Sequence, residues 1–85
     1  MYKLVFTKIA ERNLKSLNKD SYFLIKNKLL LLSQDPNLLE NNIKRLKNTD
    51  AFRLRVGNYR VIFEKDEGVL KIIIIKIKHR SEVYK

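Results

Sequence analysis

The chain has no cysteine, one histidine, one proline and two glycines among its 85 residues. Without cysteine it can form neither disulfides nor thiolate metal sites, which fits a reducing cytoplasm. A single histidine also argues against a metal site built from imidazole ligands. The few glycines and the lone proline leave little sequence for linkers, and the chain is too short for two cores. We therefore expect a single domain over residues 1–85, with no metal and no cofactor.

A long apolar run is also lacking. The N-terminal stretch MYKLVFTK has no apolar signal-peptide core, and no run reaches the roughly 18–20 residues of a membrane span. We therefore expect a soluble cytoplasmic protein without a membrane partner. Lys and Arg number 19 against nine Asp and Glu, a formal net charge of +10 at pH 7. Such a field attracts polyanions, nucleic acid above all, although a lysine-rich composition that only confers solubility would give the same charge.

The first half of the chain predicts a strand and two helices. YKLVF at residues 2–6 alternates like a strand, and Thr7 is suited to cap a helix. A second helix starts at a cap supplied by Asp20 or Ser21 and ends before Pro36, because proline disfavours helical geometry in the preceding residue. The apolar stripe of the first helix consists of Ile9, Ala10, Leu14 and Leu17.

The second half opens with a predicted hairpin. AFRLRV and YRVIFE flank a two-residue Gly-Asn turn at residues 57–58, which suits the twist of a hairpin. In this register Arg55 lies opposite Arg60, and Phe52 lies opposite Phe63. A slip of one residue would mix the two faces, so the pattern itself supports the register. One face then carries Phe52, Leu54, Val56, Tyr59, Val61 and Phe63, and the other carries Arg53, Arg55 and Arg60.

The last predicted strand, VLKIIIIKIK, is apolar on both faces in its middle, as expected for an interior strand. A three-residue loop, with Asp66 and Glu67 in the turn and Gly68 in a left-handed position, would set Arg60 opposite Ile74. We prefer this loop because a two-residue turn would bury the cations of the strand. The even positions then share the arginine face: Ile72, Ile74, Lys76, Lys78 and Arg80.

Together these elements predict an α+β fold of order β-α-α-β-β-β, with two antiparallel helices packed on one face of a small antiparallel sheet. Residues 37–50 read as a loop with apolar anchors. The sheet face away from the helices becomes a cationic concavity, whose apolar floor consists of Ile62, Ile72 and Ile74.

The stretch FRLRVGNYRVIFE…VLKIIIIKIKHRSEVY resembles the RelE/ParE superfamily of bacterial toxins, on the RelE side. Members share an Arg-x-Arg-x-Gly-x-Tyr-Arg hairpin, a hydrophobic strand that ends in a basic residue, often His-Arg, and a Val-Tyr pair shortly afterwards. TKIAERNLKSL, the Asp-Pro after the second helix and IKRLKN before the hairpin also fit, so the likeness covers essentially the whole chain.

The resemblance implies a RelE-like microbial RNase fold and a toxin of a type II toxin–antitoxin system. The activity it implies is that of an mRNA interferase, a metal-independent endoribonuclease that enters the ribosomal A site. There the 2′-hydroxyl of the mRNA attacks the adjacent phosphate. The implied partners are the ribosome, mRNA and a small cognate antitoxin, acidic or amphipathic where it makes contact.

The resemblance also suggests catalytic residues. Arg60 matches the hairpin arginine that clamps the scissile phosphate, and Arg80 is expected to contact phosphate from the cationic face. Tyr84 matches the C-terminal tyrosine that stacks on a nucleobase or assists proton transfer. His79 could act as general acid or base or be structural, and its odd position points it away from Arg60 if the strand continues regularly. Contacts to RNA are expected from Lys44, Arg45, Lys47, Arg53, Arg55, Lys76 and Lys78.

The chain departs from the family pattern before the hairpin, where Ala51 and Arg53 stand at positions that carry lysines in some members. A lysine base in the first hairpin strand is therefore in doubt, because arginine stays protonated. Two other functions remain open: a ParE-like toxin that inhibits DNA gyrase and cleaves nothing, and a catalytically inactive RNA-binding relative. The combination of Arg60, Arg80 and Tyr84 favours the nuclease.

Overall fold

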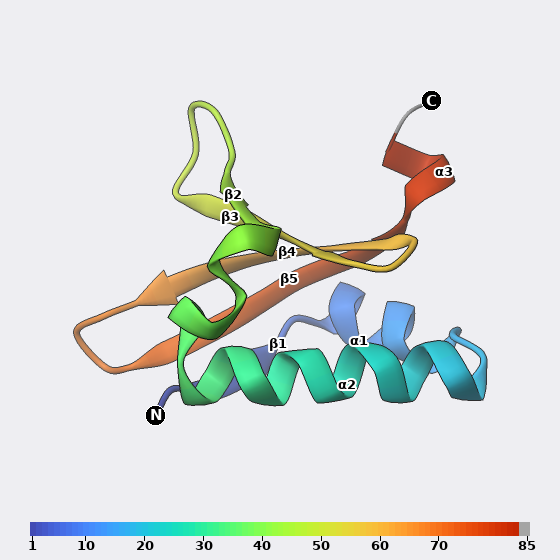
Figure 1. Ribbon diagram of the computed structural model, residues 1–85, viewed down its shortest axis with the longest axis horizontal. Coiled ribbons are helices and arrows are strands. Elements are labelled where there is room, and N and C mark those ends of the chain that lie inside the picture. Colours follow the sequence, from blue (N-terminus) through green and yellow to red (C-terminus); the bar gives the residue numbers. More distant parts are fainter. Residues whose placement is uncertain (84–85) are drawn as a thin grey trace.

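The computed structural model describes residues 1–83 and the side chains as far as Ser81, so Tyr84 lies outside the described residues. The sheet has the strand order β1-β5-β4-β3-β2, and α1 and α2 cover one face of it (Figure 1). The elements in chain order are β1 (Lys3–Phe6), α1 (Lys8–Lys15), α2 (Lys19–Gln34), the 3-10 helix η1 (Pro36–Asn42), β2 (Ile43–Arg45), β3 (Ala51–Val56), β4 (Tyr59–Asp66), β5 (Lys71–His79) and α3 (Arg80–Val83).

The predicted α+β fold with two helices on one sheet face is confirmed, but the sheet is mixed rather than antiparallel. β1 pairs with β5 in parallel, while the other neighbouring strands are antiparallel. The sheet face away from α2 carries the β2–β3 loop at one end and α3 at the other (Figure 1).

The helices begin at side-chain caps. The Thr7 hydroxyl accepts a hydrogen bond from the amide of Ala10 at 3.1 Å, as its predicted role requires. The cap of α2 is Asn18, whose side chain accepts from the amide of Ser21 at 2.9 Å. The prediction that Asp20 or Ser21 caps this helix is therefore wrong, because both lie inside its first turn.

Residues 37–50 are more ordered than the predicted loop. Pro36 begins η1, where its missing amide hydrogen is not needed, and Asp35 caps the helix by accepting from the amide of Asn37 at 3.0 Å. The short strand β2 then pairs with β3. It adds an edge to the sheet beside the predicted hairpin.

The core lies between the sheet and α2. Ile25, Leu29 and Leu32 of α2 are essentially inaccessible to solvent. The sheet side consists of the apolar hairpin face that the alternation predicts, together with residues of β5. Its buried members are Leu54, Val56, Val61, Phe63, Ile72, Ile74 and Ile77.

The first hairpin has the predicted register, including the Arg55–Arg60 and Phe52–Phe63 pairs. Gly57 adopts a φ of +56°, which glycine tolerates better than other residues. The second hairpin differs from its prediction. Its loop spans residues 67–70, and Leu70 rather than Gly68 has the positive φ, +52°.

The register of β5 against β4 is also different from the predicted one, because β5 contains a bulge. Ile62 pairs with Lys76 but Phe63 pairs with Ile74, so Ile75 is an extra residue in β5. The bulge places Ile74 on the core face of the sheet. The lysines that follow the bulge in β5 stay on the same face as the arginines. The predicted apolar floor of Ile72 and Ile74 is therefore wrong, since both have 0% exposure.

The bulge is held by the start of the chain. The Thr7 hydroxyl donates to the carbonyl of Ile75 at 2.6 Å, and the side-chain oxygen of Asn13 accepts from the amide of Ile77 at 2.9 Å. Side chains of α1 and its cap thus make hydrogen bonds to backbone groups of β5 at the bulge and just after it.

Candidate nucleic-acid interface

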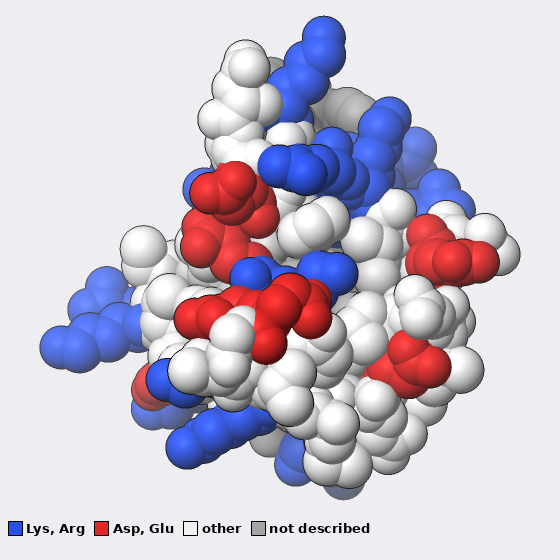
Figure 2. Space-filling view, turned by 90° about the vertical axis from the view of Figure 1, so that its left-hand side faces the viewer, with Lys and Arg blue, Asp and Glu red and all other residues white. Residues whose placement is uncertain are grey.

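Basic side chains form two rows across the sheet face that the helices leave uncovered. One row runs from Arg55 through Arg60 to Lys78 across β3, β4 and β5. Figure 2 shows Lys and Arg gathered over the upper part of the molecule. The second row contains Lys44, Arg53, Ile62 and Lys76. We call the basic residues of both rows the cationic face: Lys44, Arg53, Arg55, Arg60, Lys76 and Lys78.

These rows place like charges directly opposite one another, an arrangement that destabilises a sheet. Within the described part of the chain, the ion pairs of Arg45 with Asp50 at 3.7 Å and of Lys65 with Glu67 at 3.8 Å both lie off the cationic face. No carboxylate among the described side chains pairs with any residue of that face. The repulsion is therefore uncompensated within the described residues.

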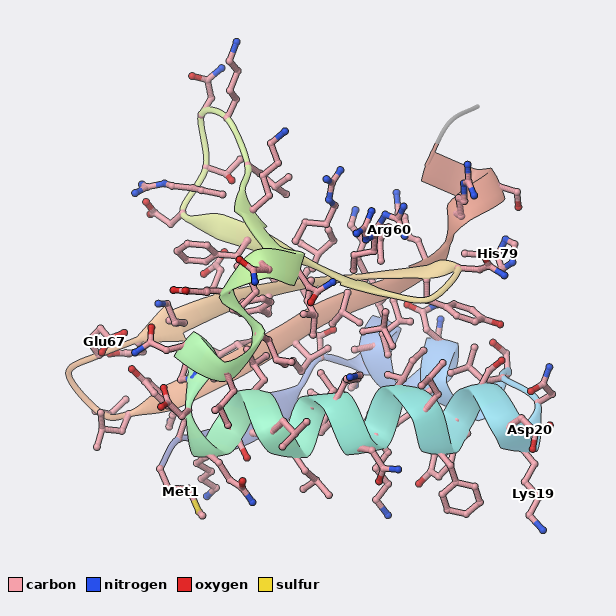
Figure 3. The ribbon with its side chains drawn as sticks, viewed as in Figure 1. Met1, Lys19, Asp20, Arg60, Glu67 and His79 are labelled. Atoms are coloured by element: carbon pink, nitrogen blue, oxygen red, sulfur yellow. The ribbon has the colours of Figure 1, made fainter. Side chains whose placement is uncertain are left out.

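Arg60 is the most buried residue of the cationic face, with only 5% exposure. One of its terminal nitrogens, Nη1, donates to the carbonyl of Tyr59 at 3.0 Å and to that of Gly57 at 3.4 Å. The Nε atom is buried and has no hydrogen-bond partner. Figure 3 shows Arg60 on the sheet side away from α2. A guanidinium fixed in this way, with no carboxylate partner among the described side chains, is suited to a bound phosphate.

The other basic side chains are more accessible. Arg53, Lys76 and Lys78 are half-buried, while Lys44 and Arg55 are exposed. Beside them, at the β2 edge, lies a cavity of about 220 Å³. Its lining consists of Asn41, Asn42, Ile43, Lys44, Arg53 and Arg55. The two asparagines were not among the predicted site residues, and their adjacency to the basic stretch IKRLK was the available signal.

Two residues predicted to contact RNA lie elsewhere. Arg45 pairs with Phe52, which places it on the opposite sheet face from Lys44, and its guanidinium forms the exposed ion pair with Asp50. Lys47 is exposed in the loop between β2 and β3. The structure therefore brings neither of them into the cationic face.

The end of β5 differs from the regular strand that the sequence predicts. His79 is its last residue and pairs with Tyr59, so its side chain lies on the face opposite Arg60, as its odd position predicts. The two rings meet edge to face, with centroids 5.2 Å apart. Arg80 is exposed and begins α3, so its predicted place at the next even position of the strand is wrong.

The described residues contain no group of three or more His, Asp or Glu side chains able to hold a metal ion. Among the same residues, none of the helices has the length and apolar character needed to cross a membrane.

Solved toxin structures share this fold. A chain of the archaeal RelE–RelB complex from Pyrococcus horikoshii is 30% identical, with a TM-score of 0.81 and coverage of 93% of this chain and 94% of that one. A chain of the RelBE2 toxin–antitoxin complex from Mycobacterium tuberculosis is 26% identical, with a TM-score of 0.79 and coverage of 93% and 98%. The isolated RelE toxin of Escherichia coli, 24% identical, has the same fold with a TM-score of 0.78 and coverage of 99% and 92%.

No curated protein sequence matches the chain. Residues 4–84, however, match the family model of the ParE toxin of the type II toxin–antitoxin system parDE. The match includes both hairpins and the cationic face. The chain therefore belongs to the ParE toxin family of type II toxin–antitoxin systems, within the RelE/ParE superfamily.

Proposed function

We propose that this toxin is a ribosome-dependent endoribonuclease of the cytoplasm that cleaves mRNA in the A site. The observation that carries the proposal is the buried guanidinium of Arg60, which lies between Arg55 and Lys78 and has no carboxylate partner among the described residues. A planar donor fork flanked by cations suits a phosphodiester. The likeness to chains of RelE–RelB complexes supports the same choice.

The reaction is an attack of the 2′-oxygen of RNA on the adjacent phosphorus, with departure of the 5′-oxygen of the next nucleotide. A base takes the proton of the 2′-hydroxyl, and an acid returns one to the 5′-oxygen. The products are a 2′,3′-cyclic phosphate and a 5′-hydroxyl, and no metal ion is needed. Arg60 would stabilise the charge that develops on the phosphorane, with Arg55 and Lys78 beside it.

The remaining roles follow from position. Arg53 is a poor general base because its guanidinium stays protonated, whereas Lys76 and Lys78 supply amines on the same face. We assign phosphate contact to Arg80. We assign base stacking or proton transfer to Tyr84, which lies outside the described residues. The other residues assigned to RNA contact, ribosomal RNA included, are Lys44, Arg45, Lys47 and Arg55.

The cognate antitoxin is the expected protein partner, since the structural neighbours include complexes of RelE with RelB. Two surfaces of the toxin suit a segment that is amphipathic and acidic. One is the cationic face. The other is the exposed surface of α2, where four large apolar side chains are 36–47% exposed. They are Phe23, Leu24, Leu30 and Leu31.

Expression of wild type, Arg60→Ala and Arg12→Ala in bacterial cells, followed by primer extension on mRNA, tests the proposal. Arg12 is exposed on α1, so its replacement removes the same charge from a surface away from the cationic face. We expect codon-associated cuts with wild type and Arg12→Ala, and a loss of about 100-fold or more with Arg60→Ala. Equal cutting by all three variants would contradict the assignment.

The match to the ParE toxin model favours a second candidate, a toxin that inhibits DNA gyrase and cleaves nothing. The same cells distinguish the two functions. DNA damage with intact mRNA would establish the second candidate and overturn the nuclease.

A further inference from the structure

The β3–β4 turn links Arg60 to α3 through three consecutive backbone carbonyls. Those of Gly57 and Tyr59 accept hydrogen bonds from Nη1 of Arg60. The carbonyl between them, that of Asn58, accepts from the backbone amide of Arg80, the first residue of α3. The guanidinium and the end of the described chain are therefore fixed to the same turn, from two different elements.

The helix α3 needs such support because a helix of one turn is not stable by itself. Its second residue, Ser81, makes two hydrogen bonds to a single atom. The Ser81 amide donates to Nδ1 of His79 at 3.2 Å, and the Ser81 hydroxyl lies 2.9 Å from the same nitrogen. His79 thus occupies the position before the helix and accepts from the second helical amide, as Asp or Asn does in an N-cap.

This contact determines where the proton of the imidazole is. A backbone amide can only donate, so Nδ1 of His79 must carry its lone pair, and the hydrogen of the neutral ring is on Nε2. The imidazole ring also contacts the ring of Tyr59, edge to face, at an interplanar angle of 89°. Figure 3 shows His79 at the end of β5, near the β3–β4 turn.

We propose that His79 is a positioning residue that caps α3 and thereby holds this helix against the turn that fixes Arg60. Its Nδ1 is engaged by Ser81, and its ring lies on the sheet face opposite the cationic face, so it does not exchange protons with RNA. The structural part of this inference stands on the contacts alone. Its consequence for cleavage rests on the proposed nuclease function.

Three substitutions separate capping from packing and from acid–base chemistry. His79→Asn keeps an acceptor suited to the cap but has no titratable ring. His79→Phe keeps the ring contact with Tyr59 but has no acceptor. His79→Ala keeps neither. We expect His79→Asn to cleave within about threefold of wild type, because asparagine is among the best N-cap residues. His79→Phe and His79→Ala should lower kcat by about 2- to 30-fold, the population change that loss of one cap produces.

The kinetic assay uses purified ribosomes programmed with a defined mRNA and separates kcat from KM. A general acid or base at this position would be lost equally in all three variants, at a cost of on the order of 100-fold or more. If His79→Asn falls as far as His79→Ala, the proposal is overturned. Cleavage by His79→Phe at the wild-type rate would overturn it as well, since capping would then be unnecessary.

A second measurement does not depend on nuclease activity. Nitrogen-15 NMR of the full chain labelled at histidine should show the hydrogen on Nε2 and an unprotonated Nδ1. The Ser81 amide should exchange with solvent more slowly in wild type and His79→Asn than in His79→Phe. A ring protonated on Nδ1, or a Ser81 amide that exchanges equally fast in all variants, would refute the cap even if the toxin cleaved no RNA. The cap confirmed together with intact mRNA would instead refute only the proposed function.

Discussion

Replacement of Arg60 by methionine should abolish toxicity and leave the fold at least as stable as before. Methionine is unbranched, flexible and uncharged, so it can occupy the buried position of Arg60. It loses one good hydrogen bond, at 3.0 Å, and one weak bond, at 3.4 Å, together worth about 1–3 kcal/mol. It also removes the buried unpaired Nε, whose burial destabilises the wild type by about 1–3 kcal/mol.

Two further gains come from the neighbours of Arg60. Its repulsion with Arg55 and with Lys78, which lie directly opposite it, costs roughly 0.2–1 kcal/mol for each pair. When the lost hydrogen bonds are set against the removed nitrogen and the relieved repulsion, the free energy of unfolding of Arg60→Met is higher than that of wild type by about 1 kcal/mol. For a chain of this size that corresponds to a rise in Tm of about 4–8 °C. The wild-type residue would then be kept for function at the expense of stability.

Thermal and urea unfolding of wild type, Arg60→Met and Arg12→Met measure the effect, and Arg12 controls for the loss of one charge. Added inorganic phosphate should raise the Tm of wild type and Arg12→Met more than that of Arg60→Met, because an anion bound only to the folded state stabilises it. A loss of more than about 2 kcal/mol in Arg60→Met, with Arg12→Met unchanged, would refute the reasoning. Arg60 would then be a structural residue of the hairpin.

Three further predictions concern stability. The hydrogen bond that the Tyr2 hydroxyl donates to Glu67, aided by burial and the negative charge of that carboxylate, raises the pKa of Tyr2 above its ordinary value of 10.0. The resulting contribution to the free energy of unfolding should be fully present below pH 10 and be lost as pH rises through the raised pKa. Urea unfolding at pH 8–12 should show this loss in wild type but not in Glu67→Gln. Replacement of Thr7 by valine should cost about 1–3 kcal/mol in urea unfolding, because both the helix cap and the bond to Ile75 are lost, whereas serine should restore most of it. Alanine at Gly57 should cost roughly 1–2 kcal/mol by the same measurement, because of its φ of +56°, and an unchanged midpoint would contradict that reading.

The first hairpin could be predicted in full because its sequence alternates. Apolar and basic residues alternate from Phe52 to Val56, and Arg60 stands between Tyr59 and Val61, so only one register keeps the arginines out of the core. The Gly-Asn turn at residues 57–58 then fixes which residues lie opposite one another. Periodicity and turn chemistry agree here, and the structure follows both.

The strand β5 could not be predicted in the same way, because four consecutive isoleucines, Ile72 to Ile75, carry no alternation. Apolar side chains are buried equally well whether the even-numbered or the odd-numbered residues of β5 face the core. What decides between them is the bulge at Ile75, and its partners Thr7 and Asn13 lie more than 60 positions earlier in the chain. A local pattern contains no information about such distant contacts.

The sequence predicted the sheet face that carries Lys76 and Lys78 correctly and the position of Arg80 wrongly. Lys76 and Lys78 do share the side of Arg60, because the predicted register is displaced from the observed one by an even number of positions there. The error at Arg80 has a different cause. The strand stops at His79, since the carbonyl of Asn58 and the imidazole of His79 together take the first amides of α3. Neither acceptor has a recognisable signature in the sequence.

The parallel pairing of β1 with β5 has a consequence for the folding of this toxin during its synthesis. Lys3 lies beside Lys71, so the first strand to leave the ribosome must wait for the last one to be translated before it gains its partner. The row that contains Arg60 also needs Lys78 from that late strand. A nascent chain therefore has neither the complete sheet nor the complete row of basic residues until β5 has been synthesised.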